Sequence, residues 1–431
     1  MRVLLLSTVN PEPRDVGKKA VLGGMCDYFR QEFKDADFRM IAFDGSSPGE
    51  TARLDSRRIG AASKLVSIVW HSLIMRRKSI QEAVFWSDDF VHVLQASIDR
   101  LAPDMVIFDT VRIGQYVERL KLPRARKILY LDDLFSLRYR RVLQAMSRFP
   151  GSAIDSMGNF GSNLSPWMLR LYRRLPVIQR TLLRVEANLV ERSEVRLASL
   201  FDTTLLINSS EVELLKERSG DALVDIQSLA LYGSRGAERR HWRGEPTFLF
   251  LGSLNLPHNG FSLGQFLEEW LPSLIERIPR FKLIVVGRHP TEQLLKLQEQ
   301  YPEQVILRGY VPDLGSLFDR CAGMLAPLLF GSGVKIKIID GLRYGIPIIA
   351  TDVGADGVAC DGKTGLIVEN DLGKFASHCE QLLDPEVNRR HSQAARRIFG
   401  GSYSEGATRT QYDSIFKASS AYAISTGAGN L

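Results

Sequence analysis

Between residues 327 and 351 the sequence places a glycine-rich loop between an apolar run and a helical pattern. The loop consists of Gly331, Ser332, Gly333, Val334 and Lys335. A glycine loop at the start of a helix presents unbonded backbone N–H groups and the positive end of the helix dipole, which suits a phosphate group. Lys335 adds a mobile positive charge at the same place. The loop is therefore predicted to bind phosphate.

Asp340 follows Lys335 on the same predicted helix, roughly a turn and a half further along. A carboxylate at that position would accept hydrogen bonds from ribose hydroxyl groups. Residues 345–347 (Gly-Ile-Pro) then lead into the next strand, which a second glycine loop follows at 352–358. An ordinary turn or helix cap explains a single glycine. The whole order of strand, glycine loop, helix, strand and glycine loop indicates a ligand site.

Three carboxylates in the amino-terminal half lie where apolar runs end. Asp109 ends one such run, and Asp132 and Asp133 follow another. Ligands bind at the carboxyl ends of parallel strands, so all three are candidate catalytic residues, for example as a general base. Adjacent residues of an extended chain point to opposite sides, so we expect only one of Asp132 and Asp133 to face an acceptor. The alternative for this pair is an N-cap of the helix predicted to begin near Leu134. Arg112, shortly after Asp109, is a candidate for holding an anionic acceptor.

Both halves of the chain consist of short, continuous apolar runs separated by helical patterns. The runs lie at 3–8, 38–43, 105–109, 127–131, 203–208, 248–251, 282–287, 305–309, 324–328, 347–351 and 365–368. Continuous rather than alternating apolar runs are typical of strands buried on both faces of a parallel sheet. We therefore predict an α/β protein with two doubly wound domains and a binding cleft between them.

A polar, Arg- and Gly-rich stretch at 232–246 is predicted to link these domains. We expect the first domain at 1–234, the second at 235–405, and a last helix with a frayed tail at 406–431. The length of 431 residues is enough for two or three domains that each bury a core.

Composition excludes several classes of protein. The 4 cysteines are scattered without a CxxC pair, which argues against a disulfide framework and a zinc ribbon and fits a reducing cytosol. None of the 7 histidines has a metal-binding spacing, so we expect no bound metal. The apolar run at the amino terminus is too short for a signal peptide, and no apolar run approaches the roughly 18–20 residues of a membrane-spanning helix. We expect a cytoplasmic protein.

Positive charge is concentrated in one stretch of the chain. Residues 51–200 carry 25 basic and 14 acidic side chains, whereas the whole chain has a net charge of only +7. Segments 64–78 and 166–184 mix Arg and Lys with Trp, Leu and Ile at helical spacing, as an interfacial helix on an anionic membrane does. The alternative is a core helix with a solvated basic face. No nucleic-acid-binding motif accompanies the charge, so we expect no nucleic-acid partner.

The carboxy-terminal half resembles the group 1 (family-4-like) glycosyltransferases, which have the GT-B fold. The resemblance covers roughly 110 residues of clear pattern, at 248–253, 257–259, 285–287, 307–311 and 327–357. The amino-terminal half matches more loosely, at 15–19, 109–112, 130–133 and 202–211. The resemblance implies two Rossmann-like domains facing each other across a cleft, with the last helix crossing back to the first domain.

The same resemblance implies transfer of a sugar from a nucleotide-sugar, UDP- or GDP-linked, without a cofactor. The acceptor would be a glycan or a lipid-linked saccharide of bacterial cell-surface polysaccharide or glycolipid synthesis, and an interfacial helix would place the enzyme on the cytoplasmic face of the inner membrane. The loops at Gly252-Ser253 and 331–335 would hold the diphosphate, and Asp340 the ribose. The other implied donor-binding residues are Val311 beside the base, Asp356 near the transferred sugar, and Gly17 and Lys18 from the first domain.

The chain departs from the family pattern in two respects. The usual pair of glutamates eight positions apart falls on Ser332 and Asp340, so the first acid is missing. The usual Arg/Lys pair after the Gly252 loop is also absent. Three basic residues are candidates to replace this pair: Lys335, Lys337 and Arg288. For each of them the alternative is an ordinary surface charge. His258 and His289 are either further phosphate contacts or solvated loop histidines.

Because of these departures, the sequence does not decide whether the sugar configuration is retained or inverted. They also leave other classes of function open. The missing acid is compatible with a non-catalytic nucleotide-sugar-binding partner of another transferase. A sugar-nucleotide epimerase shares the fold and needs no acceptor. A nicotinamide-dependent dehydrogenase is disfavoured because no GxGxxG follows the first strand.

Overall fold

The computed structural model describes residues 1–14, 17–33, 37–45, 60, 66–75, 77–149, 176–220, 224–231, 236–237 and 240–417. These residues form two compact units. Unit 1 contains the described residues up to Arg148 and from 176 to 229, and unit 2 contains Phe149 and the described residues from Ala230 onward. Parts of the two basic segments, at 64–65, 76 and 166–175, lie outside the described residues, as does the tail after Lys417.

Unit 1 is built on a six-stranded parallel sheet. Its strands are β1 (Val3–Ser7), β2 (Phe38–Ala42), β3 (Met105–Asp109), β4 (Arg126–Asp132), β5 (Thr203–Leu206) and β6 (Ile226–Ser228). They lie in the order β2-β1-β3-β4-β5-β6, and every neighbouring pair is parallel. All five residues of β1 and of β3 are buried, as expected for strands covered on both faces. The direction of strand order reverses between β1 and β3.

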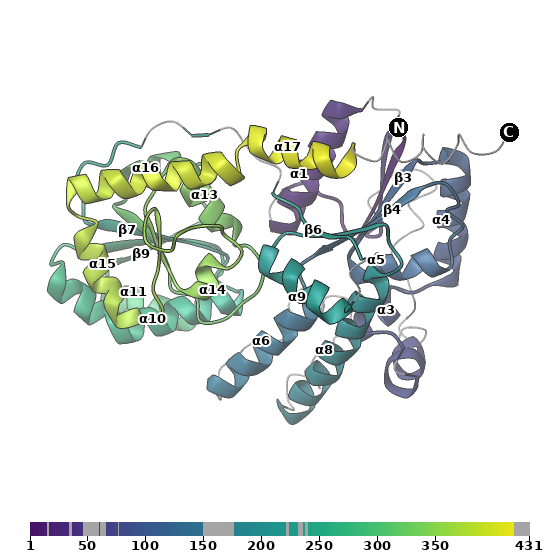
Figure 1. The fold of residues 1–431 in the computed structure, drawn as a ribbon. Coiled ribbons are helices and arrows are strands. Elements are labelled where there is room, and N and C mark those ends of the chain that lie inside the picture. Colours follow the sequence, from purple (N-terminus) through teal and green to yellow (C-terminus); the bar gives the residue numbers. More distant parts are fainter. Residues whose placement is uncertain are drawn as a thin grey trace. The chain divides into compact units, whose positions relative to one another are not determined.

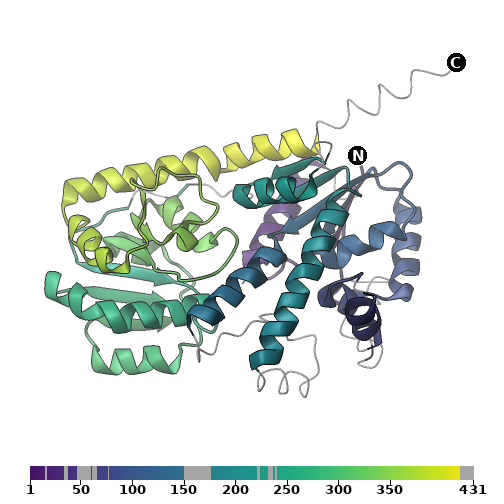
Figure 2. The same ribbon diagram turned by 60° about the horizontal axis from the view of Figure 1, so that its bottom comes forward.

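Helices connect and cover these strands. They are α1 (Gly17–Glu32), α3 (Ile80–Phe85), α4 (Asp88–Leu101), α5 (Thr110–Gly114), α6 (Phe135–Arg148), α8 (Pro176–Ala198) and α9 (Ser209–Ser219), with a π-helix at Ile68–Ile74 and a 3-10 helix at Gln115–Glu118. The two long helices α6 and α8 lie side by side (Figure 2).

Unit 2 has a second six-stranded parallel sheet. Its strands are β7 (Thr247–Leu251), β8 (Lys282–Val286), β9 (Val305–Gly309), β10 (Gly323–Ala326), β11 (Ile348–Ala350) and β12 (Leu366–Val368). The strand order is β12-β11-β10-β7-β8-β9, again with parallel pairs throughout. Strand order reverses between β7 and β10, where a doubly wound sheet opens a crevice at the carboxyl ends of its strands.

The helices of unit 2 cover both faces of this sheet. They are α10 (Pro257–Arg277), α11 (Glu292–Gln300), α12 (Gly315–Arg320), α13 (Ile336–Tyr344), α14 (Asp352–Ala355), α15 (Phe375–Gln381), α16 (Pro385–Ser402) and α17 (Glu405–Phe416), with a 3-10 helix at Leu372–Lys374. Helices α10 and α11 lie on one face and α13 and α16 on the other (Figure 1). The core between α10 and the sheet includes Phe248, Phe266 and Phe281.

The predicted fold class is confirmed: each unit is a doubly wound α/β sheet. The predicted strands all occur within about two residues of their expected bounds, and β6 is an additional one. Helix α10 begins at Pro257, because proline fits the first turn of a helix, where its missing N–H is not needed. Within the part of the chain that the structure describes, no helix is long and apolar enough to cross a bilayer.

Candidate donor and acceptor sites

Two glycine loops meet at the switch point of unit 2. One follows β7 and contains Gly252 and Ser253; the other follows β10 and contains residues 331–335. A Cβ placed on Gly331 would lie 3.7 Å from the Cβ of His258, in the first turn of α10. The loops that the sequence predicted to hold a diphosphate therefore lie next to each other, at the edge where a doubly wound sheet binds ligands.

The Gly252 loop is packed too closely for side chains. Gly252 has a φ of 153°, and a Cβ there would approach the Asn259 side-chain nitrogen to 2.7 Å. A Cβ on Gly287, at the end of β8, would meet the Gly252 carbonyl oxygen at 1.9 Å. Glycine at both positions lets the two backbones touch, and the exposed Ser253 hydroxyl donates to Asn255 Oδ1 at 2.7 Å.

Lys335 is turned onto its own loop. Its Nζ donates to the carbonyl oxygens of Ser332 at 3.0 Å and Gly333 at 2.6 Å, and the residue is only 8% exposed. Helix α13 begins one residue later, with Lys335 as its N-cap residue. In this conformation the ammonium group shapes the loop from within, whereas the sequence predicted a mobile charge for a phosphate.

Lys337 lies under the other loop. Its Nζ donates to Asn259 Oδ1 at 2.8 Å, and Asn259 Nδ2 donates to the Ser253 carbonyl oxygen at 3.1 Å. The ammonium also sits 4.4 Å from the centre of the Phe250 ring. Burial, with a smaller effect of the nearby Lys335 charge, lowers the pKa of Lys337 to about 7. Lys337 thus links α13 to the Gly252 loop through one amide.

Asp340 is a carboxylate without a protein partner. Within the described ranges no hydrogen bond or ion pair reaches its oxygens. Burial raises its pKa to about 6, and Arg343 offsets only part of this rise. Desolvated acceptors without donors are costly unless a ligand supplies the donors, and the predicted ribose contact would do so.

The remaining predicted donor-binding residues lie at strand ends of the same sheet. Arg288 is exposed after β8, with its guanidinium 4.4 Å from the ring centre of Tyr310. Tyr310 is 64% exposed and directly precedes the half-buried Val311. Asp356 is the C-cap residue of α14. Sequence reasoning missed Tyr310, although an aromatic residue directly after a strand is a signal for a stacking surface.

In unit 1 the switch point brings together Lys18 and Asp109. Lys18 Nζ, from the first turn of α1, lies 2.9 Å from Asp109 Oδ1 at the end of β3. Asp109 Oδ2 accepts from the Thr8 backbone N–H at 2.8 Å and from its hydroxyl at 2.5 Å. The Asp109 side chain is fully buried. Its oxygens hold the ends of three elements, which indicates a positioning role. Gly17, beside Lys18, is exposed.

Asp132 and Asp133 have different surroundings. Asp133 is buried and bound by Arg138, whose Nη2 and Nε lie 2.5 and 2.9 Å from Oδ2. Asp132 is half-buried, and its Oδ1 accepts from the Tyr130 hydroxyl at 2.9 Å. Burial raises the pKa of Asp132 to about 6. The positive charge of Lys18 lowers this pKa, and the negative charge of Asp133 raises it. Of the two, Asp132 is the better placed to exchange a proton with a ligand.

The backbone is strained at these strand ends. Thr110, after β3, has a φ of 64°, and Asp132, at the end of β4, has a φ of 70°. Such values are rare for non-glycine residues, and more so for a β-branched one. Strained residues persist where the surrounding structure holds them, and they cluster at functional sites.

Buried glutamates hold the turn after Asp132. Glu211 of α9 accepts the Leu134 backbone N–H at 2.7 Å, and Glu194 of α8 accepts the Ser136 N–H at 3.1 Å. Burial raises the pKa of Glu194 to about 8. The first N–H groups of α6 are therefore bound by acids from other helices. Sequence reasoning missed them, although Glu186 and Glu194, eight residues apart, share one helical face with the buried Val190.

Comparison with known proteins agrees with the site in unit 2. Residues 245–385 match the family of glycosyl transferases group 1. The second unit is a group 1 glycosyltransferase domain. The phosphatidyl-myo-inositol mannosyltransferase of Mycobacterium leprae is 30% identical over 193 residues, which make up 44% of this chain and 48% of that protein. The matches to curated relatives span between 32% and 48% of their length.

Solved structures with the GT-B fold match both units. Sucrose-phosphate synthase of Thermosynechococcus elongatus has a TM-score of 0.64 at 12% identity, covering 98% of this chain and all of that one. HepE of Anabaena, solved with UDP, has a TM-score of 0.60 at 12% identity, covering 97% of this chain and all of that one. The GT-B fold expected from the sequence is therefore confirmed for the described residues of both units.

The group 1 domain contains Asp340 and both glycine loops, within 245–385. The residues of unit 1, among them Asp109 and Asp132, lie outside that match. The role of each individual residue stays a prediction in both units. Among the described residues, no group of three or more His, Cys, Asp or Glu side chains is arranged to hold a metal ion.

Proposed function

We propose that this protein is a glycosyltransferase that moves a sugar from a nucleoside-diphosphate-sugar to a saccharide or a lipid-linked acceptor. The observation that carries the proposal is the meeting of the two glycine loops at the switch point of a group 1 domain. Backbone N–H groups of the 331–335 loop would bind the diphosphate, and Asp340 would accept from the ribose. The reaction would use neither a metal ion nor a cofactor.

The proposal extends to the setting of the reaction. Structures of similar fold were solved with UDP, and relatives of known name act on a phosphatidyl-myo-inositol. A UDP- or GDP-sugar donor and a lipid-linked acceptor at the inner membrane of a bacterium are the corresponding expectations here. Surface polysaccharide or glycolipid synthesis in the cytoplasm is the process that such substrates serve.

A thermal-shift panel tests the donor proposal. UDP, GDP, CMP, dTDP and their common sugar conjugates are compared, with NAD as the control. A ligand at about 100 times its dissociation constant stabilises the folded state by about 2.7 kcal/mol, so one nucleotide should raise the melting temperature clearly above the others. The Asp340→Asn variant should lose most of that shift while keeping its melting temperature without ligand, because the native carboxylate has no partner among the described residues.

The outcomes of this panel separate the alternatives. No shift with any nucleotide would remove the donor site from unit 2. Binding without any sugar transfer, in the presence of glycan and lipid-linked acceptors, would favour a non-catalytic nucleotide-sugar-binding partner, as the serine at position 332 allows. Epimerisation of the bound sugar without an acceptor would favour the epimerase.

We also propose that residues 66–75 touch an anionic membrane surface. Val66, Trp70 and Ile74 are 67%, 53% and 59% exposed on this helical segment, at a spacing of four residues. Arg77 is exposed nearby. Large apolar side chains on one helix face beside basic residues are the features of an interfacial helix. From segment 166–184 the described part begins at Pro176, and there Val177 is 77% exposed.

Vesicle co-sedimentation tests the membrane proposal. The wild-type chain should sediment with vesicles that contain phosphatidylglycerol and stay in solution with pure phosphatidylcholine. The double variant Trp70→Ser, Ile74→Ser should bind at least tenfold more weakly, because each large apolar side chain contributes about 1.5–3 kcal/mol when buried. Leu295→Ser, at an exposed apolar residue of unit 2, is the matched control. Equal binding to both kinds of vesicle would contradict the proposal.

A further inference from the structure

Arg112 is a half-buried cation without an acidic partner in the described part of the chain. Its Nε donates to Gln81 Oε1 at 2.9 Å, and no carboxylate lies within ion-pair distance of the guanidinium. The guanidinium carbon lies 5.4 and 5.0 Å from the ring centres of Phe85 and Phe135. Burial lowers its pKa. The two terminal nitrogens, Nη1 and Nη2, therefore have no acceptor among the described residues.

The acids around Arg112 are committed elsewhere. Asp109 is paired with Lys18, and Asp133 with Arg138. Glu186 accepts the backbone N–H groups of Ile80 and Gln81 at 2.6 and 3.2 Å. Tyr139, Asp109 and Glu186 attract the guanidinium only over a longer range. Arg138, whose guanidinium lies 5.0 Å from the Phe135 ring centre, repels it. Cation–π contacts offset only part of the cost of desolvating a charge.

Among the described residues, a second donor beside Arg112 also lacks an acceptor. The Gln81 amide nitrogen Nε2, on the side chain that holds Arg112, is buried without an acceptor. Buried unsatisfied donors are rare, and each calls for a physical explanation such as a bound ion or ligand. Arg112 and Gln81, joined by one hydrogen bond, therefore form a set of donors without acceptors in the described part of the chain.

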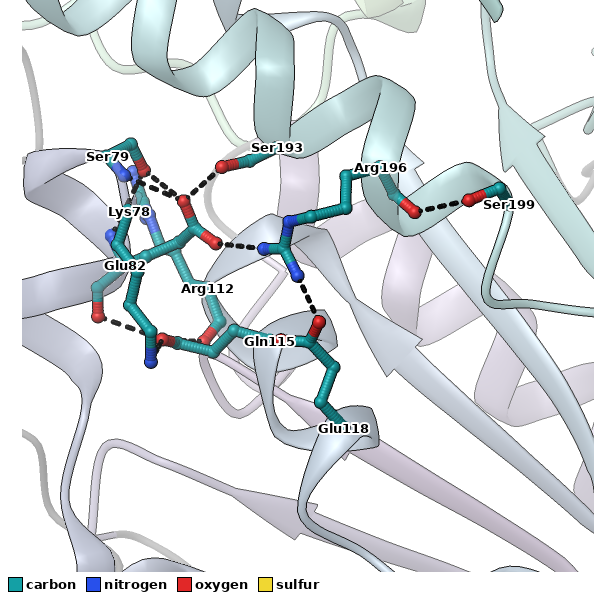
Figure 3. Close-up of polar contacts among 9 residues, drawn as sticks. All are labelled: Lys78, Ser79, Glu82, Arg112, Gln115, Glu118, Ser193, Arg196 and Ser199. Atoms are coloured by element: carbon teal, nitrogen blue, oxygen red, sulfur yellow. Dashed lines mark hydrogen bonds and ion pairs between the residues drawn. The ribbon is translucent and has the colours of Figure 1, made fainter. Parts of the chain in front are cut away.

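The elements that carry this set are tied together. Figure 3 shows Gln115 between α3 and α5: its Nε2 donates to the carbonyl oxygens of Glu82 and Arg112, both at 2.8 Å. Glu82 in turn accepts from the hydroxyl groups of Ser79 and Ser193, the latter on α8. These bonds fix α3 to α5 and to α8. The guanidinium is thereby held in one place before any ligand binds, which is how a specific oxyanion site is pre-organised.

We propose that Arg112, supported by Gln81, binds an oxyanion of the acceptor, so that the acceptor carries a phosphate or similar anionic group. A planar guanidinium whose Nε is held by Gln81 presents both Nη groups as a fork, and such a fork binds two oxygens of a phosphate. Arg112 follows the strand end of Asp109, close in sequence to the other unit 1 candidates. The inference rests on the proposed function and names the chemical class of its acceptor.

Isothermal titration of the full chain with inorganic phosphate, without nucleotide, tests the site. The Arg112→Gln variant should bind at least tenfold more weakly than the wild type, and Arg112→Lys, which keeps the charge but not the fork, should lie between them. Arg119→Gln, at an exposed arginine nearby, is the matched control and should bind like the wild type. Phosphate bound by the glycine loops of unit 2 contributes equally to every variant, so the difference belongs to Arg112.

A second readout separates binding from a structural role. Without phosphate, Arg112→Gln should melt at or above the wild-type temperature, because it removes an uncompensated buried charge. With phosphate, only the wild type and Arg119→Gln should gain. Equal phosphate binding by Arg112→Gln and the wild type would overturn the proposal. It would also be overturned if Arg112→Gln melts at a lower temperature than the wild type without phosphate and its melting temperature rises as much as that of the wild type when phosphate is added.

Two further ligands identify the source of the oxyanion. Glycerol phosphate represents a soluble phosphate monoester, and dihexanoyl phosphatidylglycerol represents a lipid headgroup; tighter Arg112-dependent binding of one of them names the source. The outcome is independent of the donor test. Arg112-dependent binding without any nucleotide shift would keep this site and remove the transferase proposal, whereas nucleotide shifts with Arg112-independent phosphate binding would do the reverse.

Discussion

Replacing Asp132 with asparagine is expected to lower sugar transfer by about 10²–10⁴-fold, the contribution typical of a positioned general base. Asp132 is half-buried at the end of β4, with a strained φ of 70° and a pKa raised to about 6. Asparagine keeps the shape of the side chain but cannot take a proton. Nucleotide affinity should not change, because the group 1 domain is in the other unit. The measurement is the initial rate of transfer together with the nucleotide dissociation constant.

The pH dependence gives an independent check on the same residue. A base with a pKa near 6 is protonated below that pH, so wild-type turnover should rise as pH increases through about 6 and then level off. The asparagine variant should lose this rising limb. The folded-state pKa of Asp132 lies above the ordinary aspartate pKa of 3.8. The stability linked to Asp132 is therefore fully present below about pH 4 and lost as pH rises through about 6. At pH 7 the variant should therefore melt at or above the wild-type temperature.

Asp133→Asn is the matched comparison. Asp133 is buried against Arg138, so its replacement should lower the melting temperature, because it leaves the guanidinium without its acid. Turnover per folded molecule should stay close to that of the wild type. A large loss of turnover in Asp133→Asn with none in Asp132→Asn would assign the base to Asp133. Wild-type turnover in both variants would show that the reaction needs no enzymic base, as in a retaining mechanism.

Most of the fold could be predicted because its signals are local. The run at 105–109 forms β3 with the bounds expected, since a short continuous apolar run is typical of a strand covered on both faces. Strand β6 was missed because its three residues, Ile226–Ser228, are too few to show a hydrophobic periodicity. The start of α10 at Pro257 carries no such signal, because its first turn is polar and the apolar pattern begins only at Leu263.

The site could be predicted only in part, because side-chain direction depends on tertiary contacts. The order of strand, loop and helix identified the 331–335 loop, but not that Lys335 turns back onto its carbonyl groups. Strand ends identified Asp132 and Asp133 as a pair, whereas the partners that distinguish them, Tyr130 and Arg138, act through geometry. No spacing in the sequence would pair Gln81 with Arg112, since they meet across two short helices.

Lys337→Met is expected to weaken binding of the nucleoside diphosphate by about 10–150-fold, which corresponds to the 1.5–3 kcal/mol of a charge-assisted hydrogen bond. The physical reason is that Lys337 is a half-buried cation below the Gly252 loop, linked to Ser253 through Asn259. Methionine preserves the length and apolar packing of the chain against Phe250 while removing the charge. Titration with the nucleotide that leads the thermal-shift panel measures the loss, and Lys296→Met, at an exposed lysine of α11, is the control.

Stability and pH distinguish this ligand role from a structural one. Burial lowers the Lys337 pKa from 10.5 to about 7, so the folded state is destabilised progressively as pH falls from about 10 toward 7. The methionine variant should therefore melt at or above the wild-type temperature at pH 7 and lose that part of the pH dependence. Wild-type affinity for the diphosphate should weaken as pH rises above 7, because neutral Lys337 attracts a phosphate less. If the affinity of Lys337→Met is unchanged, the diphosphate contacts are left to the exposed Arg288 and the backbone N–H groups of the glycine loops. If, in addition, the variant melts at a lower temperature, Lys337 only supports the loop.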